Sequence, residues 1–512
     1  MHRPLLQACA ALLIAVSVPL HAAPETPAFA DAGREQRVKA LLPEIDRMYD
    51  ELAQKEHLPG LVYGVVMDGR LLHLRALGEA DLEHKIPVTS DTRFRIASMT
   101  KSFVAMAVLK LRDEGKLRLD DPVAQYLPEL KKLQLPTTDS PVPTIRHLLT
   151  MSSGLPEDNP WGDRQMARSN AEIERLLRGG LSFSTAPGTG YEYSNLGFVM
   201  LGKIVSKVSG MRFQDYVTRN ILQPLGMRNT TWEYSSIPAG QLALGYHWNH
   251  GAWQHEPILH DGDGAAMGGL ITTMDDFSRY VIFLMNAWPA RNDPDTGPVR
   301  RASVREMQHP SSFTAYQPNA TLADGETLNP KVGFYGYGLH CTRDVHNVLI
   351  VGHSGGLPGY GSQYRFAPDH GVGVIAFSNL RYAPVYGPTI RAVNLLVEKA
   401  GLQPRSIAPS RVLAERKEQV VKLLKTWDQT LAGRITAENF FLDRSSADWQ
   451  QLIADRMAAI GRIRSIGEIE PENQMRGTFR VTGELGVIDV WFTLSPEREP
   501  KIQALELRQP QS

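Results

Sequence analysis

The sequence predicts a mixed α/β (α+β) protein built from a large domain and a small C-terminal one. Apolar residues recur at helical spacing over 35–56, 98–114 and 386–400. Shorter apolar runs bounded by Gly, Pro or Asp indicate strands, at 61–67, 71–77, 337–341, 348–351, 362–366 and 373–378. A linker containing Pro and Gly at 401–410 then precedes a second set of helical and strand-like segments over 411–512.

Length and composition are those of an ordinary globular protein. The chain has 512 residues, of which 42% are hydrophobic and 21% charged, so disordered, collagen-like and coiled-coil classes are excluded. Lys plus Arg and Asp plus Glu each number 55, and this balance gives no electrostatic signature of nucleic-acid binding. The two cysteines, Cys9 and Cys341, are too few for a disulfide-stapled scaffold or a cysteine-rich metal centre.

The N-terminal residues 1–22 have the composition of a secretory signal peptide. Arg3 precedes an uncharged apolar run that is short for a membrane span, and small residues follow the run. The alternative for this run is a buried N-terminal helix. Cleavage is expected after Ala22 or Ala23, with Ala30 marking a second candidate site. We therefore expect a periplasmic or secreted protein with no integral membrane segment after signal cleavage.

The large domain is expected to extend over residues 35–400. Asp68-Gly69-Arg70 separates two apolar runs near its start, which is typical of a β-hairpin. The helix predicted for 98–114 has one apolar side, and Gly115 is suited to end it. Between 116 and 330 the chain alternates short helical stretches with loops that contain Pro and Gly.

Residues 411–512 are expected to form a separate small α+β domain. Its helices and strands are predicted at 411–431, 446–460, 476–482, 486–494 and 501–508. Trp427, Trp449 and Trp491 are interpreted as core or interface anchors. Because this segment contains no histidine or cysteine, we expect it to be dispensable for any chemistry.

Ser98 and Lys101 are spaced to share one face at the start of the helix predicted for 98–114. A serine hydroxyl needs an adjacent base to act as a nucleophile at neutral pH, and burial lowers the pKa of a lysine so that it can accept a proton. The free N–H groups of a helix start can stabilise an oxyanion. The alternative is an N-cap serine beside a solvated lysine.

Tyr193-x-Asn195 follows a loop rich in Pro and Gly. A phenol near an ammonium group can relay a proton, and an amide two residues later can donate and accept hydrogen bonds toward a substrate. The alternative is a buried aromatic residue followed by the N-cap of a helix that starts near Ser194.

His353-Ser354-Gly355-Gly356 closes the strand predicted for 348–351. A strand edge beside a nucleophile can supply a second oxyanion N–H, and glycines permit the close backbone approach that this needs. Gly356 is the candidate donor. His260-x-Gly262 has the same spacing but lies in a loop without a preceding strand.

Taken in order, S-x-x-K at 98–101, Y-x-N at 193–195 and H-x-G at 353–355 resemble the penicillin-recognising serine hydrolases. The branch that the chain resembles contains class C β-lactamases, D-alanyl-D-alanine carboxypeptidases, D-aminopeptidases and related esterases. The likeness covers about residues 35–400. Connecting segments are similar as well, at 117–123, 144–155 and 268–273.

This resemblance implies an antiparallel sheet flanked by helices, with a helical subdomain and the active site between the two. It implies that Ser98 is the acylated nucleophile, that Lys101 activates it, and that Tyr193 relays protons. The substrate-binding residues that it implies are Asn195, His353, Ser354 and Gly355. The N–H groups of Ser98 and Gly356 would form the oxyanion hole, and neither a metal nor a cofactor is implied.

One departure from the family pattern affects the expected function. The β-lactamases usually carry Lys-Thr-Gly where this chain has His353-Ser354-Gly355, so the cation that pairs with the β-lactam carboxylate is missing. Histidine there is more typical of peptidase and esterase members. We therefore expect an exported serine hydrolase that cleaves a peptide, amide or ester bond in a peptide or small-molecule substrate. A β-lactam hydrolase and a non-catalytic binding or sensor protein are the alternatives.

Two other kinds of functional site are compatible with parts of the same sequence. G-x-S-x-G at 352–356 is the nucleophile-elbow pattern of α/β-hydrolases and would make Ser354 the nucleophile, although Pro358 disfavours the strand-to-helix turn that the elbow needs. The polar segment 247–263 is rich in His and Asp and could hold a metal. We interpret it as a polar loop, because Pro257 interrupts the helix that a zinc motif would require.

Overall fold

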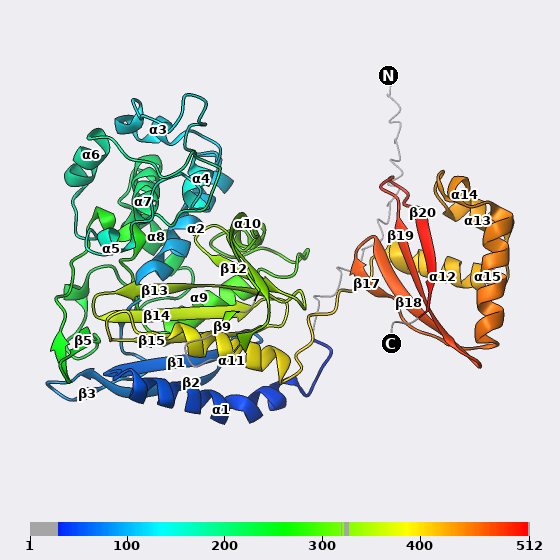
Figure 1. Ribbon diagram of the computed structural model, residues 1–512, viewed down its shortest axis with the longest axis horizontal. Coiled ribbons are helices and arrows are strands. Elements are labelled where there is room, and N and C mark those ends of the chain that lie inside the picture. The colour runs from blue at the N-terminus through cyan, green and yellow to red at the C-terminus, as the bar shows by residue number, and fades with distance from the viewer. Residues whose placement is uncertain (1–28, 319, 322–326, 510–512) are drawn as a thin grey trace, which may run out of the picture. The chain divides into compact units, whose positions relative to one another are not determined.

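The computed structural model describes residues 29–318, 320–321 and 327–509, and the signal peptide predicted for 1–22 lies outside this part of the chain. The described chain divides into two compact units (Figure 1). The larger unit contains Asp295–Ser406 and the described residues before Arg291, and the smaller unit contains the described residues from Ile407 onward. No helix of the described chain is long and apolar enough to cross a lipid bilayer.

The larger unit is built on a nine-stranded antiparallel sheet, which confirms the sheet expected from the resemblance. Its strands are β1 (Gly60–Met67), β2 (Arg70–Asp81), β3 (Ile86–Pro87), β8 (Ser312–Gln317), β11 (Lys331–Tyr335), β12 (His340–Asp344), β13 (Leu349–Leu357), β14 (Tyr360–Ala367) and β15 (Val372–Ser378). They lie in the order β3-β2-β1-β15-β14-β13-β12-β11-β8. The N-terminal hairpin thus pairs with the last strand of the unit.

The hairpin between β1 and β2 follows from its turn residues. Asp68 and Gly69 have positive φ angles of 49° and 82°, as a two-residue turn of the type that matches strand twist requires. Short strand pairs lie outside the main sheet: β4 (Phe94–Arg95) with β7 (Ile271–Thr272), β5 (Tyr246–Asn249) with β6 (Ala252–His255), and β9 (Ala320–Thr321) with β10 (Thr327–Leu328).

Helices cover both faces of the sheet (Figure 1). On one face α1 (Arg34–Lys55) and α11 (Tyr386–Glu398) pack in an apolar cluster that includes Val65 and Val374. On the other face α2 (Lys101–Asp113) and α9 (Met274–Met285) pack in a cluster that includes Val66 and Ile375. Neighbouring residues of one strand therefore contribute to opposite cores, each apolar side chain contributing about 1.5–3 kcal/mol on full burial.

The helical subdomain lies between β4 and β7 along the chain. Its helices are α3 (Val123–Tyr126), α4 (Ile145–Leu149), α5 (Asn159–Gly162), α6 (Asn170–Arg178), α7 (Asn195–Ser209) and α8 (Phe213–Val217). A further helix, α10 (Arg301–Met307), precedes β8. The start of α6 is fixed by a capping box, in which Ser169 and Glu172 accept each other's backbone N–H groups.

Helix α2 is buried on more sides than its sequence predicted. Ten of its 13 residues are buried, from Lys101 to Leu109 and at Leu111, because α7, α8 and α10 all pack against the helix. The expected apolar side is thus only part of a central core helix.

The smaller unit has the α+β composition that the sequence predicted. Its elements are α12 (Arg411–Lys425), α13 (Gln429–Ile435), α14 (Phe440–Asp443), α15 (Ser446–Ile460), β16 (Ile463–Ile466), β17 (Glu470–Asn473), β18 (Arg476–Gly483), β19 (Val487–Leu494) and β20 (Ile502–Arg508). The alternating residues of β19 are buried against α12 and α15 in one core. Trp449 belongs to that core and stacks on Phe440.

Two predicted elements differ from the structure. The single helix expected at 411–431 is two helices, because Thr426 is extended and the Asp428 side chain caps α13 by accepting from the Leu431 N–H. The strand expected at 337–341 begins only at His340. Gly338 has a φ of +68°, a conformation that turns the chain between β11 and β12.

Candidate active site

Ser98 lies in η1 (Ala97–Thr100), a single 3₁₀ turn that runs directly into α2. Ala97 has a φ of 49°, in the left-handed region that residues other than glycine rarely adopt. Such strain costs about 1–3 kcal/mol and is concentrated at functional sites. The preceding residue is held on both sides, because the Ile96 N–H donates to the Leu270 carbonyl and the Ile96 carbonyl accepts from the Ser362 hydroxyl. The surrounding fold therefore fixes the strained turn that carries Ser98.

Lys101 is brought against Ser98, as the sequence predicted. Its side chain is fully buried, and its Nζ lies 3.0 Å from Ser98 Oγ, 2.6 Å from Asn195 Oδ1 and 2.7 Å from the Met267 carbonyl oxygen. The amide and carbonyl oxygens can only accept hydrogen bonds. A neutral amine satisfies both with its two N–H groups, which leaves its lone pair for the Ser98 hydroxyl proton.

The environment of Lys101 favours that neutral form. Burial lowers the pKa of Lys101 from 10.5 to about 7, against the opposing effect of the Asp163 and Asp158 carboxylates. A substantial fraction of the amine is therefore unprotonated near neutral pH, which is the state that can remove a proton from Ser98.

The first turn of α7 is anchored by the loop before α5. The Asp158 carboxylate accepts from the backbone N–H groups of Asn195 at 2.6 Å and Leu196 at 2.9 Å. The Ser194 hydroxyl caps the same helix by accepting from the Gly197 N–H. These contacts place Asn195 beside Lys101.

The side chain of Asn195 contacts Lys101 and does not line the cavity. Its Oδ1 accepts from Lys101, and its Nδ2 donates to Asn159 Oδ1 at 3.0 Å. The sequence predicted that Asn195 binds substrate. In the structure both ends of the amide make hydrogen bonds within the protein, and Asn159 lines the cavity, so the substrate-binding role of Asn195 stays a prediction.

Tyr193 lies beside Ser98 and Lys101 as a neutral phenol. The centre of its ring is 5.0 Å from the Nζ of Lys101, and the ring is parallel to that of His340. Burial raises the pKa of Tyr193 well above its usual value, although a hydrogen bond with Ser98 opposes this. Lys101, not a Tyr193 phenolate, is therefore the group that can accept a proton near neutral pH.

His353 lies on β13 at the wall of the site, and both of its ring nitrogens are occupied. Its Nδ1 is 2.6 Å from the Ser354 carbonyl oxygen and must carry the proton, so Nε2 accepts from the Tyr335 hydroxyl at 3.0 Å. Burial lowers the pKa of His353 well below its usual value. Both hydrogen bonds of the His353 ring are thus made within the protein, and its role in binding substrate stays a prediction.

The glycines of β13 allow the strand to approach the nucleophile turn. A Cβ at Gly355 would lie 2.2 Å from the Ile96 carbonyl oxygen, so any side chain there would push β13 away from η1. Pairing of β13 with β12 ends at Gly352, while its pairing with β14 continues to Leu357. Gly356, the predicted second oxyanion donor, lines the same cavity as Ser98.

The nucleophile-elbow alternative for Ser354 is wrong. An elbow needs a sharp turn from a strand into a helix, whereas Ser354 lies within β13 and the chain returns directly as β14. Ser354 pairs with Gln363 in the ladder between the two strands.

A cavity of about 590 Å³ opens onto Ser98. The residues Tyr193, His353, Ser354 and Gly356, which the motifs predicted, contribute to its wall. Six further wall residues were not predicted: Asn159, Pro160, Asp163, Tyr191, His340 and Tyr382. Tyr191 could have been found from its position two residues before Tyr193. The others come from segments without a motif.

The described wall of the cavity has one acidic side chain, Asp163. Burial raises the pKa of its carboxyl group above the usual value. Burial also lowers the pKa of His340 to about 3, so both histidines of the wall are neutral at physiological pH, and Asp163 is the side chain of the described wall that can carry a charge there.

The histidines that suggested a metal lie in separate polar contacts. His247 pairs with Glu256, and His260 with Glu233. Within the described chain no group of three His, Cys, Asp or Glu side chains is placed to hold a metal ion.

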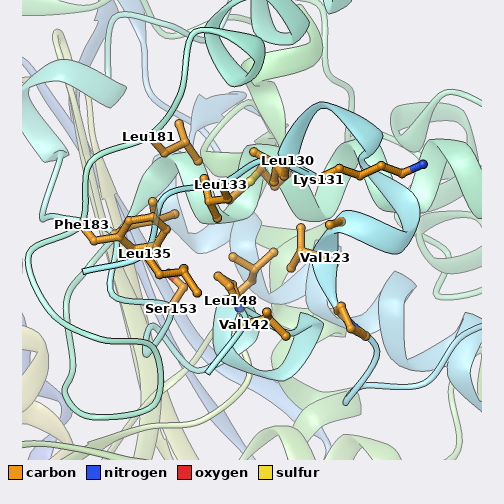
Figure 2. A pocket seen from close by; sticks show the side chains of 15 residues that line it. Val123, Leu130, Lys131, Leu133, Leu135, Val142, Leu148, Ser153, Leu181 and Phe183 are labelled. Atoms are coloured by element: carbon orange, nitrogen blue, oxygen red, sulfur yellow. The ribbon is translucent and has the colours of Figure 1, made fainter. Parts of the chain in front are cut away.

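A second cavity, of about 120 Å³, lies in the helical subdomain (Figure 2). Leucine and valine side chains such as Leu133 and Leu148 converge on it, while the amine of Lys131 extends away from them. Ser98 lines the larger cavity and does not line this one.

Residues 45–399, which carry this site and its sheet, match the family model described as Beta-lactamase. The chain belongs to the beta-lactamase family. Among curated proteins it is similar to Protein flp of Staphylococcus aureus strain MW2, with 28% identity over 349 residues. That match covers 67% of this chain and 64% of the relative. Beta-lactamase-like protein 2 of Dictyostelium discoideum is 28% identical over 380 residues, or 71% of this chain and 65% of the relative.

Solved structures show the same beta-lactamase-family fold. The octameric penicillin-binding protein homologue from Pyrococcus abyssi aligns with a TM-score of 0.56 and 23% identity, over 90% of this chain and 93% of that one. The penicillin-binding protein from Bacillus halodurans aligns with a TM-score of 0.52 and 24% identity, over 68% of this chain and 98% of that one. At this identity the likeness concerns the fold.

Proposed function

We propose that this beta-lactamase-family chain is an exported serine hydrolase that forms an acyl-enzyme on Ser98 and cleaves an amide or ester bond. One observation carries the proposal. The fully buried amine of Lys101, with a pKa of about 7, has two protein acceptors for its N–H groups and the Ser98 hydroxyl for its lone pair.

Acylation begins with transfer of the Ser98 proton to the neutral amine of Lys101. Ser98 Oγ attacks the substrate carbonyl carbon, and the carbonyl oxygen takes the negative charge between the N–H groups of Ser98 and Gly356. The proton then passes to the leaving amine or alcohol, either from Lys101 or through the Tyr193 hydroxyl. The bond to the leaving group breaks, and an ester on Ser98 remains.

Deacylation repeats these steps with water as the nucleophile. Lys101 accepts a proton from water while the water oxygen adds to the ester carbonyl carbon, the bond between that carbon and Ser98 Oγ then breaks, Lys101 returns the proton to Oγ, and the carboxylic acid is released. Asn195 acts in both halves as a positioning residue, since it fixes the orientation of the Lys101 amine.

Hydrolysis of β-lactams is less well supported than that of peptides, amides or esters. A β-lactam carries a carboxylate, and the wall of the cavity offers it the Asp163 carboxylate and two neutral histidines. The electrostatics of the site therefore favour neutral or cationic substrates.

A fluorophosphonate probe followed by peptide mapping tests the proposal. We expect the label on Ser98, and we expect prior incubation with a slowly hydrolysed ester to prevent labelling. Label on Ser354, or stable acylation of Ser98 without product release, would contradict the proposed turnover. A side-by-side assay of a short-chain aryl ester, a D-alanyl-D-alanine peptide and a chromogenic cephalosporin then ranks the substrate classes.

The smaller unit is proposed to be dispensable for this chemistry. Each predicted catalytic residue lies in the larger unit, which has its own sheet and two apolar cores. We expect a chain truncated near residue 405 to keep at least about half of the turnover of a short-chain aryl ester, since no reacting group is lost. The full-length chain is the control, and circular dichroism checks folding. A folded truncation with no esterase activity would show that the smaller unit takes part in catalysis.

A further inference from the structure

Asp163 occupies an unusual position for a carboxylate. It follows α5 immediately, is only 8% exposed, and lines the cavity that opens onto Ser98. Its charge acts on the catalytic pair, because it opposes the lowering of the Lys101 pKa. Taking a charged group out of water costs free energy unless a partner compensates it.

Contacts within the protein offset only part of the free energy that it costs to remove the Asp163 carboxylate from water. Among the described residues, Tyr382 is the one side chain that donates a hydrogen bond to Asp163, at 2.9 Å to Oδ2. Asp158, five residues earlier, instead accepts from two backbone N–H groups of α7 with its two oxygens. Both oxygens of Asp158 thus accept hydrogen bonds from the protein, whereas Oδ1 of Asp163 can still accept one from a ligand in the cavity.

No cation of the described wall competes for this carboxylate. Lys101 is enclosed by Ser98, Asn195 and Met267. Arg164 follows Asp163 in the chain, but it is exposed and does not line the cavity. Tyr191 and Tyr382 add aromatic surface to the same wall, and aromatic faces attract cations as well.

We propose that Asp163 binds a substrate ammonium group, so that the preferred substrates are amides or esters of amino acids or peptides with a free amino group near the scissile carbonyl. This inference rests on the proposed function, since it names the substrate class of the same site. Asp163 is thus a specificity-determining residue. Tyr382 is its positioning residue, because its hydroxyl orients the carboxylate.

The test compares two substrates that differ only in the amino group. An alanine p-nitroanilide with a free α-amino group and its N-acetyl derivative are assayed at pH 7, in both stereochemical forms. The ratio of kcat/KM for the free over the acetylated substrate is the readout. Changes in the reactivity of Ser98 and Lys101 cancel in this ratio, because both substrates use the same acylation step.

Asp163→Asn is the informative variant, because asparagine can still accept from Tyr382 but has no charge. We expect the ratio to favour the free amine in the unmodified chain and to fall about tenfold or more in Asp163→Asn, the range of a charged hydrogen bond. Glu157→Gln is the matched control, since it removes the same charge from an exposed position six residues earlier. Its ratio should stay unchanged. Equal ratios in Asp163→Asn and the unmodified chain would overturn the inference.

Binding without turnover gives a second readout. In a Ser98→Ala background, calorimetry with alanine amide should show binding that weakens at least about tenfold when Asp163→Asn is added. Acetylated alanine amide should bind equally to both variants. Hydrolysis of the acetylated substrate with no preference for the free amine would refute the role of Asp163 and leave the serine hydrolase intact. Absence of any acylation of Ser98 would instead refute the proposed function.

Discussion

Ser98→Ala should lower turnover of every substrate by about ten-thousandfold or more, which is the scale seen when a serine nucleophile is removed. Without Oγ no acyl-enzyme forms, and the remaining oxyanion donors can stabilise only direct attack by water. The side chain is small and sits at an already fixed turn, so folding should be unaffected. Steady-state kinetics on an aryl ester, together with intact-protein mass after incubation with it, measures both consequences.

The neighbouring hydroxyl Ser102 provides a matched control for this substitution. It is buried in α2 four residues later, and it donates to the Met99 carbonyl while accepting from Tyr280. Ser102→Ala should cost stability through the Tyr280 contact, yet it should still show an acyl mass shift on Ser98. Residual turnover in Ser98→Ala within a factor of ten of the unmodified chain would move the nucleophile elsewhere.

Lys101→Met should lower kcat by about a thousandfold, the range of a positioned general base. Methionine has a similar length and fits an apolar site, but it has no lone pair that can take the Ser98 proton. Lys101→Arg should be no more active, because a guanidinium stays protonated. Recovery of activity in Lys101→Met by small external amines would support the base role. An active Lys101→Met enzyme would exclude it.

The pH dependence of the unmodified chain follows from the same amine. The pKa of Lys101 is lowered to about 7, and only the deprotonated form is a base, so kcat/KM for an N-acetylated substrate, which has no titrating amine, should rise with pH through about 7 and then level off. The neutral histidines of the wall add no step there, since burial lowers the pKa values of both. A rate profile with no rise between pH 5.5 and 8.5 would contradict this assignment.

The free energy of unfolding should also rise with pH. Between about pH 7 and 10.5 the unfolded chain holds a proton on Lys101 that the folded chain has lost, so folding is penalised most at low pH and less as pH rises. The full penalty is on the order of 5 kcal/mol. The Lys101→Met variant has no titrating group at this position and therefore lacks this penalty. The gain in unfolding midpoint with pH should therefore be larger in the unmodified chain than in this variant.

The catalytic pair could be predicted because its chemistry depends on local spacing. Ser98 and Lys101 are three residues apart, and a 3₁₀ turn followed by a helix brings them together almost as a regular helix would. The helices, the hairpin at Asp68-Gly69 and the strands of the smaller unit were also predictable, because periodicity and turn residues act over short distances.

The rest of the wall depends on tertiary contacts that leave no local pattern. His340 reaches the cavity because β12 pairs with β13, so that it lies opposite Gly352. Asp163 and Tyr382 are more than 200 residues apart and meet through one hydrogen bond. The contact between Asn195 and Asn159 could not be predicted for a similar reason, because Asn159 comes from a segment without any motif.

The burial of α2 on almost every side has an evolutionary consequence. Mutations that shift Ser98 or Lys101 would also disturb a helix with ten buried residues, so selection should remove them quickly. Part of the cavity wall, including Asp163 and Tyr382, comes instead from connecting segments outside the helices and strands. Descendants of such a fold can therefore change substrate through a few substitutions in these segments. The positions of Ser98 and Lys101 are meanwhile inherited unchanged.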